Sequence, residues 1–200
     1  MQALEPRDPY GAALGAVQRF AAAGRFVPGE PIVVTELAAE VGLSATPVRE
    51  ALACLAGQGL IERRRGRGYF YPALGPSEII DLFELQLAYL NAALTLYPRG
   101  LTPLRKAAVA VDPLAGVQTL FDAVITQSSN AALILAHRRV VDRLKAVLTV
   151  ERRLDASDGA TVRTMVSKIV EGRIPDLLGL LEAYHERRCA RVPALVAEAG

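Results

Sequence analysis

The sequence predicts a mostly α-helical protein, with an N-terminal winged helix-turn-helix containing a small β-hairpin and a C-terminal antiparallel bundle of six or seven helices. Three observations support this fold class. Two helical segments flank a glycine-containing turn at residues 42–44, an arginine- and glycine-rich hairpin follows them, and the chain after residue 77 has a helical pattern throughout. A Gly-Pro break at residues 75–76 separates the expected domains, 1–74 and 77–200.

The first domain is expected to begin with a helix and to continue through short elements. The predicted segments are a helix over 10–23, a turn at 28–30, a strand over 32–34, a helix over 36–41 and a helix over 46–57. Thr35 is the expected N-cap of the helix at 36–41, with Glu36 in its first turn. This order is that of a helix-turn-helix.

The helix at 46–57 has two distinct faces. Its core face is expected to consist of the apolar residues that recur at helical spacing, namely Val48, Ala51, Leu52 and Leu55. Thr46 and Arg49 project elsewhere, and Pro47 is tolerated in the first turn, where its missing N–H is not needed. The second face is therefore available for a partner.

Residues 59–71 predict a β-hairpin with an arginine-glycine tip. Between residues 44 and 75 there are five arginines and two glutamates, a local excess of positive charge that indicates a polyanion contact. A solvated loop is the alternative, but the position of this run after a helix-turn-helix favours DNA. The helix fits the major groove, where Arg49 can donate two hydrogen bonds to a guanine edge or a phosphate. The hairpin can reach phosphates or the adjoining minor groove.

Residues 28–70 resemble the winged-helix domain of GntR-type regulators, especially the FadR-like branch. The segments PGE, LAAEVGLS, TPVREAL, GLI and RGRG occur in the order and spacing of that family. The resemblance implies a dimer that binds operator DNA and whose affinity is altered by a small molecule in the C-terminal domain. It implies DNA contacts at Ser44, Thr46, Arg49, Arg65, Arg67 and Gly68. Ala45 stands where the family usually has an arginine, so we expect an operator that differs from the usual one.

The second domain is expected to be helical over residues 77–96, 103–109, 113–128, 130–153, 160–171 and 175–198, with a kink at Pro193 and Asn130 as a cap. It resembles, more weakly, the FadR-type C-terminal domain, in which the helices surround a cavity. On the first helix, a stripe formed by Asp81, Glu84, Ala88, Asn91 and Thr95 is expected to face solvent, so that Gln86 points inward. On the last helix, His185 lies on an apolar face with Leu178, Leu181, Cys189 and Val192. A histidine on such a face is either a ligand-binding residue or an ordinary core residue.

Many members of that branch bind a metal ion through one aspartate and three histidines. Alignment on Asn130 places Val117 and Phe121 at the first two of these positions and Arg163 at the third, so that only His185 remains. The sequence therefore predicts no metal site and no cofactor. The candidate effector-binding residues are Gln86, Phe121, Arg163 and His185, and the effector would be an organic acid or a more apolar molecule. Arg163 could instead pack its stem and extend its head into solvent, and His137 is expected at a partly exposed surface position.

Length and composition agree with a globular cytoplasmic protein. Apolar residues make up 52% of the 200-residue chain. We expect no membrane span, because no run of about 18 apolar residues occurs, and no secretory signal, because the start is acidic and proline-containing. Cys54 and Cys189 lie far apart, form no metal-binding pair and are expected to be buried thiols.

Two classes of function follow from these features, and a third is disfavoured by them. The first is an effector-responsive repressor or activator that binds operator DNA as a homodimer. The second is a DNA-binding dimer whose helical domain only mediates oligomerisation. An enzyme is not expected, because the chain has two histidines, no glycine-rich phosphate loop and no nucleophile elbow.

Overall fold

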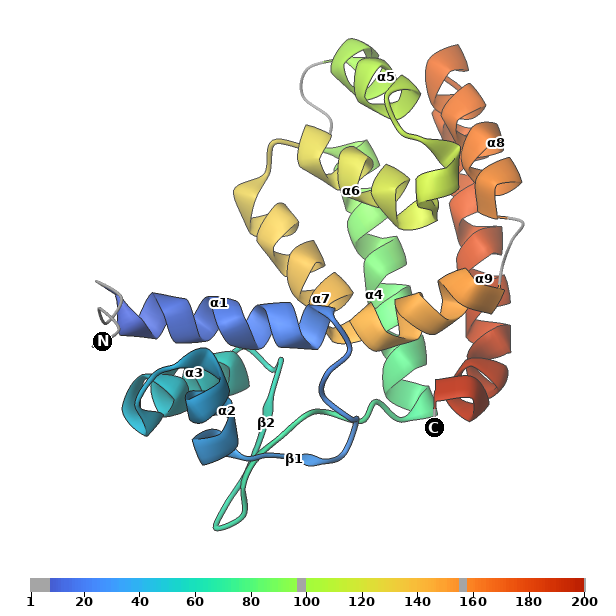
Figure 1. Ribbon diagram of the computed structural model, residues 1–200. Helices are drawn as coiled ribbons and strands as arrows, with labels where there is room; N and C mark the ends of the chain where they lie inside the picture. The colour runs from blue at the N-terminus through green and yellow to red at the C-terminus, as the bar shows by residue number, and fades with distance from the viewer. Residues whose placement is uncertain (1–7, 97–99, 155–157, 200) are drawn as a thin grey trace. The chain divides into compact units, whose positions relative to one another are not determined.

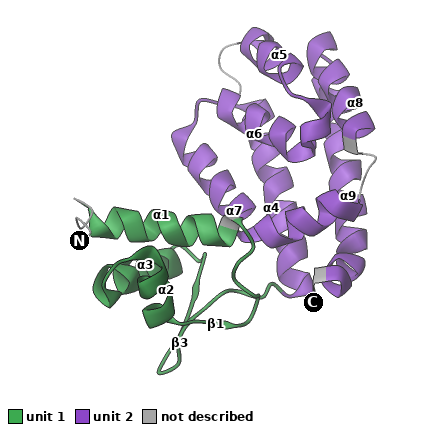
Figure 2. Cartoon of the chain, viewed as in Figure 1, with its two compact units in different colours: residues 1–74 green, residues 75–200 purple. Residues whose placement is uncertain are grey.

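The computed structural model describes residues 8–96, 100–154 and 158–199 and confirms the predicted fold class (Figure 1). The chain divides into two compact units, residues 1–74 and residues 75–200 (Figure 2). Among the helices of the described ranges, none is long and apolar enough to cross a membrane.

The first unit combines short helices with a small antiparallel sheet. Its elements are α1 (Pro9–Ala22), β1 (Pro31–Ile32), α2 (Val34–Val41), α3 (Ala45–Gly57), β2 (Glu62–Arg64) and β3 (Gly68–Phe70). The strand order is β1-β3-β2, so β3 lies in the middle and pairs with both neighbours. The two strands β2 and β3 form the predicted hairpin, which is the wing of the winged helix.

The predicted boundary between the first strand and the second helix was wrong. The strand ends at Ile32, opposite Tyr69, because the next residue, Val33, is already the N-cap of α2 and does not continue the pairing toward Gly68 of β3. Helix α2 therefore starts two residues earlier than predicted. Its N-cap is Val33, whose carbonyl accepts from the amide of Leu37 (3.0 Å), and Thr35 lies inside the first turn.

The core of the first unit lies between α1, α2, α3 and the sheet. The predicted core face of α3 is confirmed, since its four members are at most 2% exposed. Other buried members come from the neighbouring elements, namely Ala13, Val17, Ile32, Leu37, Ala38 and Ile61. Gly42 ends α2 in the left-handed conformation (φ 69°), which permits the tight turn into α3. This core fixes α3 in place and leaves its other face exposed.

The second unit is a helical bundle around α4. Its elements are α4 (Pro76–Thr95), α5 (Leu101–Val109), a 3-10 turn (Pro113–Ala115), α6 (Val117–Gln127), α7 (Ala131–Leu154), α8 (Asp158–Glu171) and α9 (Ile174–Ala199). Helix α4 contacts α6, α7 and α9. The predicted helix at 113–128 is interrupted, because Gly116 adopts a positive φ of 91° that ends the 3-10 turn before α6 begins. The predicted cap is confirmed: the side chain of Asn130 accepts from the amide of Leu133 (3.1 Å).

Two expectations about exposure need correction. Four members of the α4 stripe are exposed, but Asn91 is half-buried and its side-chain oxygen is buried with no partner among the described residues. Both cysteines are free, as expected, but each is half-buried and not enclosed. Cys54 lies on the edge of α3 outside its core stripe, and Cys189 lies one residue past a buried position of α9.

Candidate functional site

The start of α3 presents three polar side chains to solvent. Ser44 is the N-cap of the helix, in an extended conformation (φ −73°, ψ 162°), and its hydroxyl makes no capping bond. Thr46 and Arg49 are three residues apart and therefore lie on one face of the helix. All three are exposed, so a partner can approach the beginning of α3 directly.

One side of this surface is acidic. Ser44 and Thr46 line a shallow hollow of about 490 Å³, whose other polar lining residues include Asp8, Tyr10 and Glu50. Two carboxylates in this hollow disfavour an approaching phosphate. Contacts with a polyanion are therefore expected on the side of Arg49.

The wing has a tight tip made of residues 65–67. The amide of Arg67 donates to the carbonyl of Arg64 (3.0 Å), which closes the turn. Gly68 has a φ of 95°, a conformation that other residues rarely adopt, so the start of β3 depends on glycine. Arg65, Arg67 and Gly68 are exposed. The tip therefore offers two cations and an uncovered stretch of backbone.

A side-chain contact connects the wing to α3. The hydroxyl of Tyr69, on β3, donates to the carbonyl oxygen of Arg49 (3.4 Å). The first unit therefore holds both groups of predicted DNA-contacting residues: three at the start of α3 and three on the wing. Ala45 is half-buried in the first turn of α3 and has no polar atom beyond its backbone.

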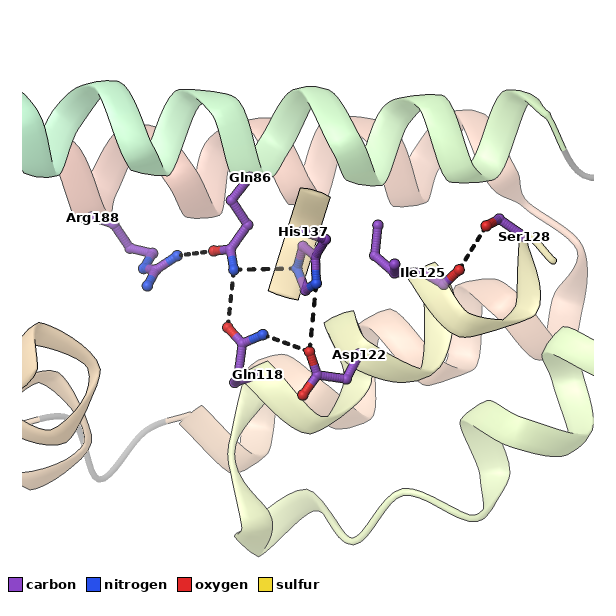
Figure 3. A network of polar contacts seen from close by, with 7 residues as sticks. All are labelled: Gln86, Gln118, Asp122, Ile125, Ser128, His137 and Arg188. Carbon is purple, nitrogen blue, oxygen red and sulfur yellow. Dashed lines mark hydrogen bonds and ion pairs between the residues drawn. The ribbon is translucent and has the colours of Figure 1, made fainter. Parts of the chain in front are cut away.

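A network of polar side chains lies inside the second unit (Figure 3). Gln86, predicted to point inward, is fully buried. Its side-chain oxygen accepts from Nη1 of Arg188 (2.7 Å), and its nitrogen donates to Oε1 of Gln118 (3.0 Å) and lies 3.5 Å from Nε2 of His137. Gln86 thus links helices α4, α6, α7 and α9.

Arg188 and Glu151 form a buried ion pair that the sequence analysis missed. The guanidinium donates from Nε to Oε1 (2.7 Å) and from Nη2 to Oε2 (2.8 Å), and it lies 3.8 Å from the centre of the Phe83 ring. The spacing in the sequence could have indicated that Arg188 faces inward, because it lies one helical turn after the buried residue Tyr184 and one turn before the buried residue Val192. A charged residue on an apolar stripe indicates a buried partner.

His137 is buried, and the expectation of a surface position was wrong. It lies four residues after Leu133 and three before Val140, on the buried face of α7, and is 3% exposed. Its Nδ1 is 3.7 Å from Oδ1 of Asp122. Burial lowers the pKa of His137 to about 4, so its imidazole is neutral at pH 7. Loss of hydration around its carboxylate raises the pKa of Asp122.

His185 and Phe121, both predicted effector-binding residues, lie against each other in the bundle. Their rings stack with centroids 5.4 Å apart, and Tyr184 meets both rings edge-on. Nδ1 of His185 donates to the carbonyl of Leu181 (2.8 Å), so the imidazole keeps its lone pair on Nε2. Nε2 is buried and has no hydrogen-bond partner among the described residues. Burial lowers the pKa of His185 to about 4.

Arg163 does not face inward. The buried stripe of α8 runs through Val162, Met165 and Ile169, and Arg163 is one residue off this stripe and exposed. The alternative, in which the guanidinium of Arg163 extends into solvent, is the arrangement observed. Val117 and Phe121 are buried apolar residues. Within the described residues, no group of three or more histidine, cysteine, aspartate or glutamate side chains could hold a metal ion.

The two buried histidines predict a stability that falls with acidity. The pKa of each is about 4 in the folded chain and 6.5 as its ordinary value, so between these values the unfolded chain binds more protons. Stability is therefore highest above pH 6.5 and decreases as the pH falls toward 4, by up to about 1.4 kcal/mol per pH unit for each histidine. Urea unfolding at a series of pH values measures this slope. His137→Gln should remove about half of it, and an unchanged slope in this variant would show that His137 is not the group responsible.

Most of the first unit is similar to a known family of bacterial regulators. Residues 15–70 match the family model of the bacterial regulatory proteins of the gntR family. Over these residues the chain is similar to the GntR-family helix-turn-helix domain. This match covers α3 and the wing, which hold all six predicted DNA-contacting residues.

Two named relatives are transcriptional regulators. The chain is 38% identical over 71 residues to the Nta operon transcriptional regulator of Aminobacter aminovorans, covering 36% of this chain and 34% of that protein. It is 33% identical over 86 residues to an HTH-type transcriptional regulator from the TAR-I ttuE-ttuC' intergenic region of Agrobacterium vitis, covering 43% and 50%. These matches span between a third and a half of each relative. The GntR family and these relatives are transcriptional regulators and not enzymes.

Solved structures share the fold over nearly the whole chain. A GntR-type transcriptional regulator from Rhodococcus sp. RHA1 superposes with a TM-score of 0.75 at 19% identity, covering 92% of this chain and 97% of that one. E. coli McbR/YncC superposes with a TM-score of 0.62 at 16% identity, covering 97% and 99%. At these identities the likeness concerns the fold, which includes the helical unit as well as the GntR domain.

Proposed function

We propose that this protein is a transcriptional regulator of the FadR-like branch that binds operator DNA as a homodimer. The observation that carries the proposal is the exposed start of α3 beside an arginine-bearing wing within a GntR-family domain. In this proposal α3 enters the major groove, where Ser44 and Thr46 contact base edges and Arg49 contacts a base edge or a phosphate. Arg65, Arg67 and the backbone at Gly68 contact phosphates or the adjoining minor groove.

A dimer fits this role because one winged helix reads only a few base pairs. Two copies related by symmetry read two half-sites and so gain useful specificity. Sedimentation of the whole chain, with and without DNA, tests this part of the proposal. A protein that binds bacterial operator DNA works in the cytoplasm, and we therefore propose this location for the chain.

Replacing Arg49 tests the reading of bases. We expect Arg49→Ala to weaken binding to a preferred duplex by about 1–3 kcal/mol and to reduce discrimination against single-base variants, because a guanidinium fork that pairs with a base edge is lost. Fluorescence anisotropy with a duplex selected by the wild-type chain from a random pool measures both effects. Arg19→Ala, which removes an exposed arginine of α1, is the matched control.

If Arg19→Ala and Arg49→Ala weaken binding equally for all sequences, Arg49 contributes only charge. The assignment of α3 as the reading helix would then be contradicted. Loss of preference in Arg49→Ala alone supports it.

The helical unit is proposed to bind a small organic effector beside Phe121 and His185, with Gln86 in the same unit as a further candidate. The buried lone pair of His185 Nε2 supports this, since an acceptor without a partner favours a ligand with a hydrogen-bond donor. Arg163 is left out of the proposed site because it is exposed.

A thermal-shift screen of small organic acids and apolar metabolites tests the effector. A compound that raises the melting temperature and changes DNA affinity in the wild-type chain, but not in His185→Gln, supports the site. The second candidate function is a purely oligomerising helical unit. It is favoured because Phe121 stacks on His185 and because Arg188 is hydrogen-bonded to Glu151 and Gln86, so these side chains already have partners inside the unit. If the screen finds no compound that stabilises the wild-type chain and changes its DNA affinity, the purely oligomerising unit is favoured.

A further inference from the structure

The four arginines of the wing, residues 63, 64, 65 and 67, differ in what they contact. Arg64 donates from Nε to Oε1 of Glu62 (2.9 Å) and from Nη2 to Oε2 (2.8 Å), so that both carboxylate oxygens are occupied by one guanidinium. Its guanidinium carbon also lies 4.1 Å from the centre of the Phe70 ring. No hydrogen bond or ion pair of the described chain involves the side chain of Arg63 or Arg65.

The register of the hairpin explains this arrangement. Glu62 and Arg64 are two residues apart on β2 and lie on one face, and Phe70 of β3 is directly opposite Glu62. Opposite Arg64 stands Gly68, which has no side chain. The guanidinium can therefore lie across the glycine position and reach the Phe70 ring, which is only 7% exposed.

We propose that Arg64 is a positioning residue that holds the wing in its DNA-binding shape and does not itself contact DNA. This rests on the proposed DNA-binding function. To reach a phosphate, Arg64 would have to release two charge-assisted hydrogen bonds and its aromatic contact. The negative charge of Glu62 is matched by the same guanidinium, and this hydrogen bond lowers the pKa of Glu62. The positive field of the wing therefore comes from Arg63, Arg65 and Arg67.

The opposite face of the hairpin points to a role for Arg63, which was not among the sequence-predicted contacts. Arg63 pairs with Tyr69 across the strands, and the hydroxyl of Tyr69 donates to the Arg49 carbonyl. Arg63 is exposed and shares the face of the wing that is turned toward α3. It is thus placed between the reading helix and the tip, where the phosphate backbone would pass.

The salt dependence of binding separates a positioning residue from a phosphate contact. Each phosphate contact that is lost lowers the slope of log affinity against log salt concentration by about 0.9. The probe is the duplex of about 30 base pairs selected by the wild-type chain, which is long enough for two half-sites a helical turn apart. We expect Arg64→Ala to weaken binding by about fivefold with an unchanged slope, because an organised ion pair is lost but no phosphate contact.

Glu62→Ala is the second variant and gives the sharper result. Removing a negative charge near DNA would strengthen binding if Glu62 acted only through its charge. We expect it to weaken binding about as much as Arg64→Ala, and we expect the double variant to be no worse than either single one. Arg63→Ala and Arg65→Ala are the contact controls, and each should lower the slope.

Three results would overturn the inference. They are a lower slope in Arg64→Ala, tighter binding in Glu62→Ala, or wild-type affinity in both. The melting temperature of each variant, compared with wild type, shows whether the domain stays folded. If the wild-type chain selects no duplex at all, the proposed function itself fails, and the role of Arg64 in DNA binding fails with it.

Discussion

Arg188→Ala is expected to lower the free energy of unfolding by about 3–5 kcal/mol, because it leaves the carboxylate of Glu151 buried without a partner. The pair is enclosed, with the two side chains 4% and 12% exposed. Gln86 would lose a charge-assisted hydrogen bond at the same time. Urea denaturation followed by circular dichroism measures the loss.

Two further variants make this prediction specific to the buried pair. Arg163→Ala removes an exposed arginine of the same unit and should change stability by no more than about 0.5 kcal/mol. Arg188→Leu combined with Glu151→Leu removes both charges and should recover much of the stability lost in Arg188→Ala. A loss below about 1 kcal/mol in Arg188→Ala would mean that Glu151 reaches water and that the pair is not a core element.

Phe121→Ala is expected to cost about 3–5 kcal/mol of unfolding free energy, because a fully buried ring is removed from the centre of the helical unit. The ring contacts Tyr184 and His185, so its removal leaves a cavity lined by aromatic groups. Leu135→Ala, at a position of α7 that is 51% exposed, is the control and should have a small effect.

This variant also bears on the two views of the helical unit. If apolar compounds stabilise Phe121→Ala and not the wild-type chain, the ring fills the space that an effector would need. Stabilisation of the wild-type chain by the same compounds would instead show a site that is open beside the ring. A cost below about 1 kcal/mol would contradict the central position of Phe121.

Local patterns made the first unit predictable. The core face of α3 follows from apolar residues at helical spacing, and the wing follows from short β-prone segments around an arginine-glycine turn. The boundary of α2 was missed because the chain leaves its pairing with β3 after Ile32 and the carbonyl of Val33 already accepts a helical hydrogen bond from Leu37. A capping residue in the sequence, Thr35, was not sufficient to fix the helix start.

The polar network of the second unit could not be predicted from local patterns. Gln86 meets partners that are 32, 51 and 102 residues away, and helical periodicity gives the direction of a side chain but not the identity of its neighbour. For this reason Gln86 was placed inward while Arg188 and Glu151 were missed. His137 was misplaced because its charged neighbours suggested a surface position, although its spacing to Leu133 and Val140 indicated the core.

The wing shows the same limit at shorter range. Composition counts every arginine of the run as a possible DNA contact, whereas the strand register assigns Arg64 to Glu62 and Phe70. Charge alone predicts that a polyanion binds here. The pairing of strands decides which cations remain available to it.

Selection of duplexes from a random-sequence pool by the whole chain is the decisive measurement of whether this protein reads DNA sequence. We expect enrichment of a motif with two-fold symmetry, read through the start of α3, and a weaker motif when the same pool is selected with Arg49→Ala. Affinity for the enriched duplex should fall steeply with salt, since arginine–phosphate contacts release counterions. Recovery of unenriched sequences with an affinity that does not depend on salt would contradict a sequence-reading, arginine-bearing DNA interface.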